Sequence, residues 1–175
     1  MVDRIILVGM MGAGKTTTGR LLADRLDWPY LDSDEQVVAE TGRTVPELFA
    51  ERGEAGFRAE EERVLTDALS AGRPVVVSAA GGVVLSPANR DLLAHSGTVV
   101  WLRADPGVLA GRVGDGVGRP LLDDDPAAAL SALYEVRRPF YQSVAHVVVD
   151  VDHLAPGEVV ERILAVTGLR PGETA

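Results

Sequence analysis

Residues 5–16 read IILVGMMGAGKT, and this stretch decides how the rest of the chain is interpreted. Residues 5–8 are apolar and mostly β-branched, which predicts a short buried strand. Residues 9–16 match the phosphate-binding pattern G-x-x-x-x-G-K-[ST], and a helical pattern with Leu22 and Leu26 on one face follows them. The strand, the glycine-rich turn and the helix therefore predict one βα unit with a polyphosphate site at the helix N-terminus.

The residue types of this loop suit a nucleoside triphosphate. Glycine lets the backbone fold tightly enough for its N–H groups to point at negative charge. Lys15 places a compact charge near the β and γ phosphates, and the Thr16 hydroxyl can ligate Mg²⁺. Lys15 is also the only lysine among 17 basic residues, which indicates a need that arginine does not meet. We therefore expect ATP to bind at Gly12, Ala13, Gly14, Lys15, Thr16 and Thr17.

Length and composition exclude several classes of protein. The chain has 175 residues with 46% apolar content, which predicts a single folded domain over residues 1–175. Its net charge of -9 opposes nucleic acid or an anionic membrane as partner. Cysteine is absent, which excludes disulfides, thiolate zinc sites and a cysteine nucleophile. No run approaches the ~20 apolar residues of a membrane span, so we expect a cytoplasmic protein.

Further apolar runs predict the remaining strands, at residues 30–31, 75–77, 99–102 and 147–149. Their continuous hydrophobicity is typical of a parallel sheet that helices cover on both faces, which indicates the α/β class. Residues 111–125 contain four glycines and a proline without a steady period. A loop of that kind inside a compact domain is often a lid over a site.

The single lysine also narrows the class of nucleotide-binding protein. A guanine-nucleotide switch ordinarily carries an Asn-Lys-x-Asp motif, which cannot be present because Lys15 is the only lysine. A motor or helicase would need a longer chain and a basic surface. A small-molecule kinase remains as the interpretation.

Asp32 and Asp34 follow the second predicted strand, at the edge where open α/β sheets bind their ligands. One carboxylate can hold Mg²⁺, while the other can accept a hydrogen bond from a substrate hydroxyl and help to deprotonate it. The alternative is a simple helix cap, because an amphipathic stretch with Val37 and Val38 comes next.

Other candidate residues have two interpretations each. Arg58 is followed by Glu61, and the pair forms either a solvated helix salt bridge or an oriented arginine that grips a substrate carboxylate. Gly81 and Gly82 follow the third strand, where they either form a plain turn or let backbone N–H groups approach a ligand. The three histidines have no ligand spacing and receive no role.

Taken together, these motifs resemble the shikimate kinase family from about residue 4 to residue 167. The family pattern D-x-D matches Asp32 and Asp34, and F-R-x-x-E matches residues 57–61. R-P-L-L matches residues 119–122, and R-x-P-x-Y matches residues 137–141. Where the family has three glycines, this chain has Ala80-Gly81-Gly82, and an alanine there would weaken acid binding if the backbone required a positive φ.

The resemblance implies transfer of the ATP γ-phosphate to the 3-hydroxyl of shikimate, with Mg²⁺ as cofactor. It implies a three-layer P-loop kinase fold whose five-stranded parallel sheet has the order 2-3-1-4-5. It also implies a substrate-binding segment near residues 33–61 and a lid near residues 112–124. We expect a monomer whose partners are ATP and shikimate.

The resemblance also assigns roles to individual residues. Lys15, Asp34 and Arg119 would be catalytic, and Thr16 with Asp32 would hold the metal. The substrate would contact Asp34, Arg58, Gly81, Gly82 and Arg137, with the two arginines on its carboxylate. Arg119 would reach the phosphates, and Arg112 and Pro156 would enclose adenine.

Two alternatives remain open from the sequence. The first is a kinase of similar architecture that acts on gluconate or on a nucleotide. The second is a non-catalytic nucleotide-binding regulator that kept the phosphate loop and lost its acceptor site, with Ala80 as the lesion.

Overall fold

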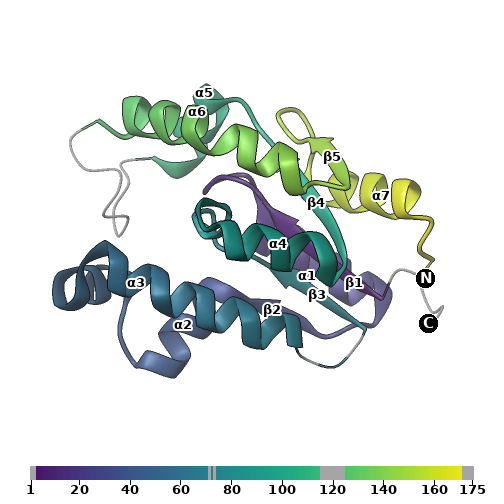
Figure 1. Ribbon diagram of the computed structural model, residues 1–175. Helices are drawn as coiled ribbons and strands as arrows, with labels where there is room; N and C mark the ends of the chain where they lie inside the picture. Colours follow the sequence, from purple (N-terminus) through teal and green to yellow (C-terminus); the bar gives the residue numbers. More distant parts are fainter. Residues whose placement is uncertain (1–2, 71, 73, 115–124, 171–175) are drawn as a thin grey trace.

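The computed structural model describes residues 3–70, 72, 74–114 and 125–170. Five parallel strands form one sheet in the order β2-β3-β1-β4-β5, which confirms the expected topology (Figure 1). The strands are β1 (Arg4–Val8), β2 (Tyr30–Asp32), β3 (Val75–Ser78), β4 (Thr98–Arg103) and β5 (Val147–Asp150). Only β3 lies between the edge strand β2 and β1, so the end of β2 lies near the phosphate loop that follows β1.

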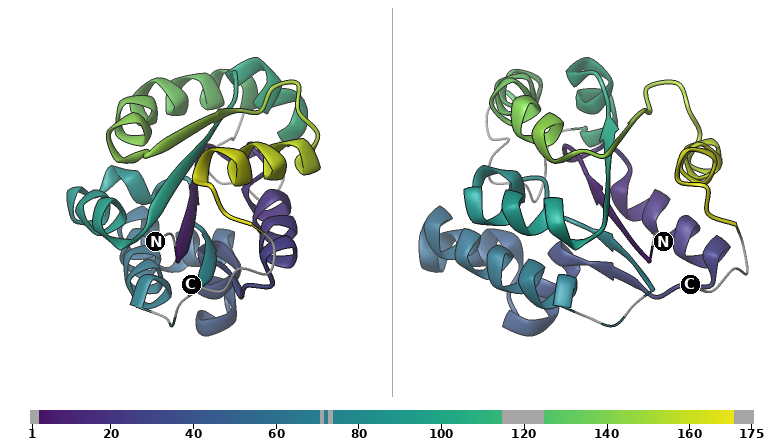
Figure 2. Two further views of the ribbon diagram at one scale, coloured as in Figure 1. Left: turned by 90° about the vertical axis from the view of Figure 1, so that its right-hand side faces the viewer. Right: turned by 45° about the vertical axis from the view of Figure 1, so that its right-hand side comes forward.

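Helices cover both faces of the sheet, as the continuous apolar runs predict. On one side lie α1 (Lys15–Leu26) and α7 (Pro156–Thr167), and on the other lie α4 (Pro87–Ser96) and α6 (Pro126–Val144), as Figure 2 shows. The remaining helices are α2 (Ser33–Thr41), α3 (Val45–Ser70), η1 (Val83–Leu85) and α5 (Pro106–Val113). The fold is therefore a three-layer α/β structure.

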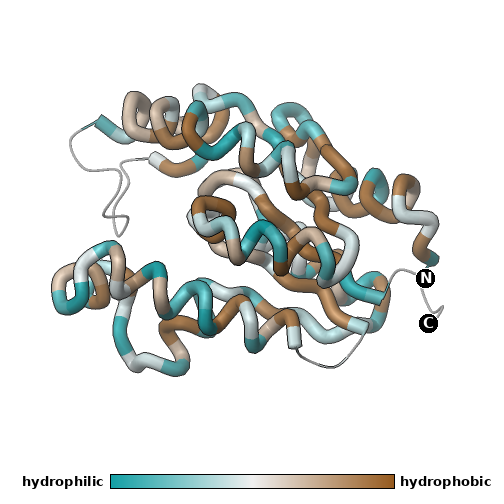
Figure 3. The backbone as a smooth tube through the Cα atoms, viewed as in Figure 1, coloured by the Kyte–Doolittle hydropathy of each residue, from teal (hydrophilic) through white to brown (hydrophobic). Residues whose placement is uncertain are grey.

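The sheet forms the core because its central strands have almost no polar side chains to hydrate. All five residues of β1 are buried, and the register pairs Ile6 with Val77 on one side and with Val99 on the other. In Figure 3 the hydrophobic colour accordingly concentrates along the central strands, whereas hydrophobic and hydrophilic residues alternate along the helices. Within the described residues, no helix is both long enough and apolar enough to cross a bilayer.

A second, smaller apolar cluster joins α2 to α3 apart from the main core. It contains Val37, Leu48, Phe57 and Val64, all buried. Within α3 the helix is interrupted at Gly53, whose φ of 65° and ψ of -178° are not helical. The helices of the predicted substrate-binding segment thus pack on each other. The predicted lid falls mostly on residues 115–124, which lie outside the described residues.

Local signals for helix starts are confirmed. The Thr44 backbone N–H donates to the Glu47 carboxylate at 2.7 Å, and the Glu47 backbone N–H donates to the Thr44 hydroxyl at 3.4 Å, as a capping box requires. Asp105 accepts a hydrogen bond from the backbone of Gly107 at 2.8 Å, ahead of Pro106 at the first helical position.

Two valines provide a matched test of where the stability resides. Val77 is 0% exposed in the interior strand β3, whereas Val148 is 42% exposed on the edge strand β5. We expect Val77→Ala to lower the free energy of unfolding by about 2 to 3 kcal/mol, because it removes two buried methyl groups and leaves a cavity. We expect Val148→Ala to cost below about 1 kcal/mol. Urea denaturation of both variants measures the difference, and equal losses would contradict a core centred on β3.

Candidate active site

A cleft of about 470 Å³ opens at the carboxyl ends of the strands, where parallel sheets of this class bind ligands. The phosphate loop, the end of β2, α3 and α6 all reach it. Most of the predicted site residues line it: Gly12, Gly14, Lys15, Thr16, Thr17, Asp32, Asp34, Arg58, Gly81, Gly82, Arg112 and Arg137. Met11, Val45, Phe49, Phe57 and Glu61 complete the lining.

The phosphate loop has the backbone of an anion site. Gly12 and Gly14 have φ values of 82° and 90°, which other residues rarely adopt, and Gly14 is the N-cap of α1. No side chain caps this helix in the part of the chain that the structure describes. The first N–H groups of α1 are therefore directed at the cleft, where a phosphate can accept them.

Lys15 folds back over the loop that precedes it. Its Nζ donates to the carbonyl oxygens of Gly9 and Met10, at 2.9 and 3.1 Å. These contacts hold the ammonium group close to the loop backbone, so its charge lies above the same concave surface that the helix N-terminus faces. A polyphosphate bound there would meet both.

Asp32 is a helix cap, as one of the two interpretations predicts, and it also contacts the phosphate loop. Its Oδ1 accepts hydrogen bonds from the backbone N–H groups of Asp34 and Glu35, at 3.0 and 3.4 Å, so it is the N-cap of α2. Its Oδ2 accepts a hydrogen bond from Thr16 Oγ1 at 2.8 Å. The cap thus fixes a carboxylate beside the hydroxyl of the phosphate loop.

Asp34, two residues on, lines the cleft, and its side chain is accessible only from that side because the protein surrounds it elsewhere. The surrounding protein shields it from bulk water and raises its pKa, while the positive charges of Lys15 and Arg58 lower it. The net direction is upward. A carboxylate whose pKa is raised binds a proton more readily, which favours a role as proton acceptor.

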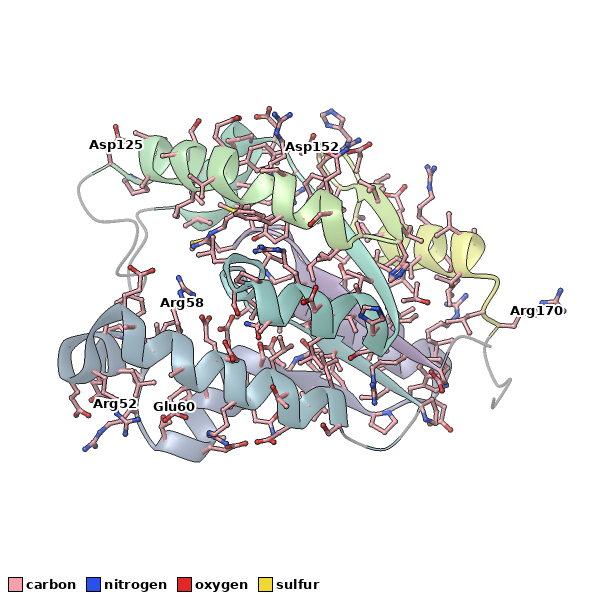
Figure 4. All side chains as sticks on the ribbon, in the orientation of Figure 1. Arg52, Arg58, Glu60, Asp125, Asp152 and Arg170 are labelled. Atoms are coloured by element: carbon pink, nitrogen blue, oxygen red, sulfur yellow. The ribbon has the colours of Figure 1, made fainter. Side chains whose placement is uncertain are left out.

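Arg58 and Glu61 form the helix salt bridge that the spacing predicts, but the pair is largely buried and not solvated. Its side chain donates to Glu61, whose side chain is only 3% exposed, and to Glu54 at 3.2 Å. Figure 4 shows Arg58 pointing from α3 toward the side that carries α6, whereas Arg52 and Glu60 project from the opposite side. Burial is the main reason that the pKa of Glu61 rises to about 7, against the attraction of Arg58.

The turn after β3 packs directly against two arginines. A Cβ at Gly82 would lie 2.0 Å from Arg58 Nη1, and one at Gly81 would lie 3.4 Å from Arg137 Nη1. Gly82 has a φ of -89°, so glycine is needed here for its lack of a side chain and not for its backbone freedom. Ala80 has no positive φ, since Asp27 is the only non-glycine residue with one among the described residues. Alanine therefore fits this position without backbone strain.

Arg137 and not Arg138 faces the cleft. Arg137 is 2% exposed and lines the cavity, whereas Arg138 is exposed and lies 4.0 Å from Glu135. Arg137 has no ion pair with any carboxylate of the described ranges. The charge of Arg137 lowers the pKa of Glu61, but no salt bridge compensates its burial, so a bound anion would stabilise it.

The other residues that were predicted to bind the nucleotide do not all line the cleft. Arg112 donates to the carbonyl oxygen of Val151 at 2.8 Å and to that of Gly12 at 3.4 Å, so it links the phosphate loop to the segment before α7. Pro156 begins α7 and Ala13 is buried, and neither is among the residues that line the cleft. Arg119 lies outside the described residues.

Two positioning residues were missed by the sequence interpretation. The Ser33 hydroxyl accepts the backbone N–H of Ala80 at 2.8 Å, and the Tyr141 hydroxyl donates to the carbonyl oxygen of Gly81 at 2.6 Å. Both are buried, and together they fix the turn that contacts the arginines. Their positions inside the D-x-D and R-x-P-x-Y patterns were the available signals.

The buried Glu61 predicts a dependence of stability on pH. Its pKa rises from an ordinary 4.5 to about 7, so the folded state holds the proton more tightly than the unfolded state. The contribution of Glu61 to the free energy of unfolding is complete below pH 4.5 and is lost as the pH rises to about 7. The free energy of unfolding should decrease by about 3 kcal/mol over this range. Glu61→Gln should flatten this slope between pH 5 and pH 8 in urea titrations.

The matched control is Glu62→Gln, because Glu62 is the next residue on α3 and is exposed. It should retain the wild-type slope. A Glu61→Gln variant with an unchanged slope would show that Glu61 is ionised throughout this range.

Comparison with known proteins agrees with this geometry. A model of the shikimate kinase family matches residues 11–167. A shikimate kinase from Burkholderia pseudomallei (strain 1710b) is 45% identical over 161 residues, which is 91% of this chain and 87% of that protein.

Among solved structures, a shikimate kinase resembles this chain more than a gluconokinase does. Shikimate kinase from Acinetobacter baumannii, in complex with shikimate, has a TM-score of 0.92 at 36% identity and covers 95% of this chain and 93% of that one. A gluconokinase from Sinorhizobium meliloti 1021 has a TM-score of 0.59 at 27% identity, covering 93% and 89%. Because the family model, the sequence relatives and the fold agree over most of the chain, the protein belongs to the shikimate kinase family.

Proposed function

We propose that the cleft transfers the γ-phosphoryl group of ATP to the 3-hydroxyl of shikimate through the residues described above. The observation that carries this assignment is the placement of Arg137, a buried guanidinium that forms no salt bridge with the described carboxylates, in the same cleft as the phosphate loop. A small hydroxy acid is the substrate that would meet both an arginine pair and a triphosphate.

The two arginines would bind the substrate carboxylate. Arg58 enters from α3 and Arg137 from α6, and both pack against the glycine turn after β3. A guanidinium binds a carboxylate through two parallel hydrogen bonds, which fixes both the position and the orientation of the acid. Local positive charge in this way lets a protein of net charge -9 bind an acidic substrate.

Asp34 would accept the proton of the attacking hydroxyl. It lies at the first turn of α2, beside Asp32 and within the field of Lys15. Its raised pKa favours proton uptake, and its exposure within the cleft leaves it accessible to a substrate hydroxyl. Lys15 would neutralise the charge that develops on the phosphates.

The residues present fit Mg²⁺, which prefers oxygen ligands together with the phosphates of a nucleotide. Thr16 and Asp32 offer a hydroxyl and a carboxylate in direct contact at 2.8 Å. Among the described residues no group of three or more acidic or histidine side chains could hold a metal alone, which suits an ion that the nucleotide helps to bind. When bound, the ion would neutralise phosphate charge during transfer.

We also assign Arg119 to the transferring phosphate and Arg112 with Pro156 to adenine, with residues 112–124 closing over the nucleotide. The resemblance of the sequence to the family supports these roles. Since ATP is the co-substrate, we place the enzyme in the cytoplasm, and we expect it to act as a monomer without nucleic-acid or membrane partners.

The non-catalytic alternative loses its main support. It depended on Ala80 as a lesion, and Ala80 has no positive φ that would strain an alanine. The decisive experiment is ADP release by the purified enzyme with ATP and Mg²⁺ against a panel of acids. Shikimate should stimulate release strongly, and gluconate or a nucleoside monophosphate should not. Turnover with gluconate alone, or binding of ATP without product from any acid, would contradict the proposal.

Asp34→Asn tests the proton acceptor. The amide keeps the shape of the side chain but takes up a proton poorly, so we expect kcat to fall by about 10² or more. The matched control is Glu35→Gln, because Glu35 is the next residue on α2 and pairs with Arg20 at the surface. It should retain near wild-type kcat. Near wild-type turnover in Asp34→Asn would remove Asp34 from the mechanism.

Gly82→Ala tests whether Arg58 binds the acid. The new methyl group would occupy the position of Arg58 Nη1, so the guanidinium must move. We expect KM for shikimate to rise about tenfold or more, as for loss of a charged hydrogen bond, while KM for ATP stays unchanged. The control is Gly111→Ala on α5, where a Cβ would meet nothing within 4 Å. Equal KM values for shikimate in both variants would argue against contact between Arg58 and the acid.

A further inference from the structure

A second hydroxyl contacts the same oxygen of Asp32 that Thr16 contacts. Tyr30 OH lies 2.9 Å from Asp32 Oδ2, and Thr16 Oγ1 lies 2.8 Å from that atom. The other oxygen, Oδ1, accepts the backbone N–H groups at the start of α2. A carboxylate can only accept hydrogen bonds, so both hydroxyl protons point at Oδ2. With its proton committed in this way, Thr16 presents its oxygen lone pairs elsewhere.

Tyr30 also joins this carboxylate to the backbone of the phosphate loop. Its hydroxyl lies 2.9 Å from Ser78 Oγ, and Ser78 Oγ lies 3.1 Å from the carbonyl oxygen of Lys15. Since the Tyr30 proton goes to Asp32, the Ser78 hydroxyl donates to Tyr30 or to that carbonyl. The chain of contacts therefore connects the ends of β2 and β3 to the first residue of α1.

The tyrosine ring has a dedicated space in the fold. A Cβ at Gly19 would lie 2.5 Å from Tyr30 Cε2 and 2.8 Å from Ser78 Oγ. Gly19 is inside α1, where glycine costs about 1 kcal/mol relative to alanine. The helix thus contains a destabilising residue where the aromatic ring and the Ser78 hydroxyl approach it.

We propose that Tyr30 is a positioning residue for the metal–nucleotide site, which acts by holding the Asp32 carboxylate against Thr16. The inference rests on the proposed role of Thr16 and Asp32 toward Mg²⁺. Tyr30 does not line the cleft, so it acts through the residues that it contacts and not on a ligand directly. Partners of this kind fix the orientation of the groups that face a metal, and their loss typically weakens metal affinity by about 10- to 100-fold.

The test is Tyr30→Phe, which keeps the ring beside Gly19 and removes only the hydroxyl. Titration calorimetry with the β,γ-imido analogue of ATP, once with Mg²⁺ and once with EDTA, measures how much the metal tightens nucleotide binding. We expect the variant to lose about tenfold of this metal-dependent gain, with the metal-free affinity and KM for shikimate unchanged. Thermal melting verifies that the variant is folded.

Two control variants make the result specific. Tyr134→Phe removes a phenol hydroxyl on α6, away from this network, and should retain the full metal-dependent gain. Ser78→Ala leaves the contact between Tyr30 and Asp32 intact, so its gain should stay within about twofold of wild type, below the loss expected for a direct partner.

Three outcomes would overturn the proposal. Equal weakening with and without metal in Tyr30→Phe would indicate a general structural role. A loss in Ser78→Ala as large as that in Tyr30→Phe would assign the effect to the link with the loop backbone. A wild-type enzyme without any metal-dependent gain would remove Thr16 and Asp32 as metal ligands, a failure that shikimate-dependent turnover distinguishes from failure of the kinase assignment.

Discussion

The N-terminus of α1, which no side chain of the described residues caps, is the constraint around which the cleft is arranged. A helix N-terminus without a side-chain cap is poorly satisfied unless water or an anion accepts its hydrogen bonds. Gly14 turns the backbone into this helix, and Lys15 lies across the loop by donating to Gly9 and Met10. The other elements of the cleft bring an acidic pair and two arginines to the edge of the sheet where this anion site opens.

Charge balance explains why groups of opposite sign are placed so closely. Asp34 and Glu61 both have raised pKa values because the protein shields them, and Arg58 lowers both. Glu61 holds Arg58 in place but is itself a costly buried acid. Arg137 is equally buried and forms no salt bridge with the described carboxylates. A negatively charged substrate would complete this arrangement, since it can meet both guanidinium groups at once.

Several ambiguities of the sequence disappear for reasons that concern particular residues. Asp32 is a helix cap and a partner of Thr16 together, because its two oxygens face different directions. Arg58 and Glu61 are predictable as a helical pair from their spacing, but their burial depends on α3 packing beside the glycine turn. Ala80 could not be evaluated without its backbone torsion, which is not positive.

The sequence by itself determined the strand, loop and helix of residues 5–26, the α/β class and most of the polar residues that line the cleft. These are local signals, because hydrophobic runs, glycine positions and the G-x-x-x-x-G-K-[ST] pattern each act within a few residues. Only the tertiary structure decided that the Ser33 hydroxyl bonds the backbone of Ala80, that Gly82 packs against Arg58 and that the Tyr30 hydroxyl contacts Asp32. The first two contacts join residues far apart in the chain and the third depends on the direction of two side chains, so spacing alone carries no information about them.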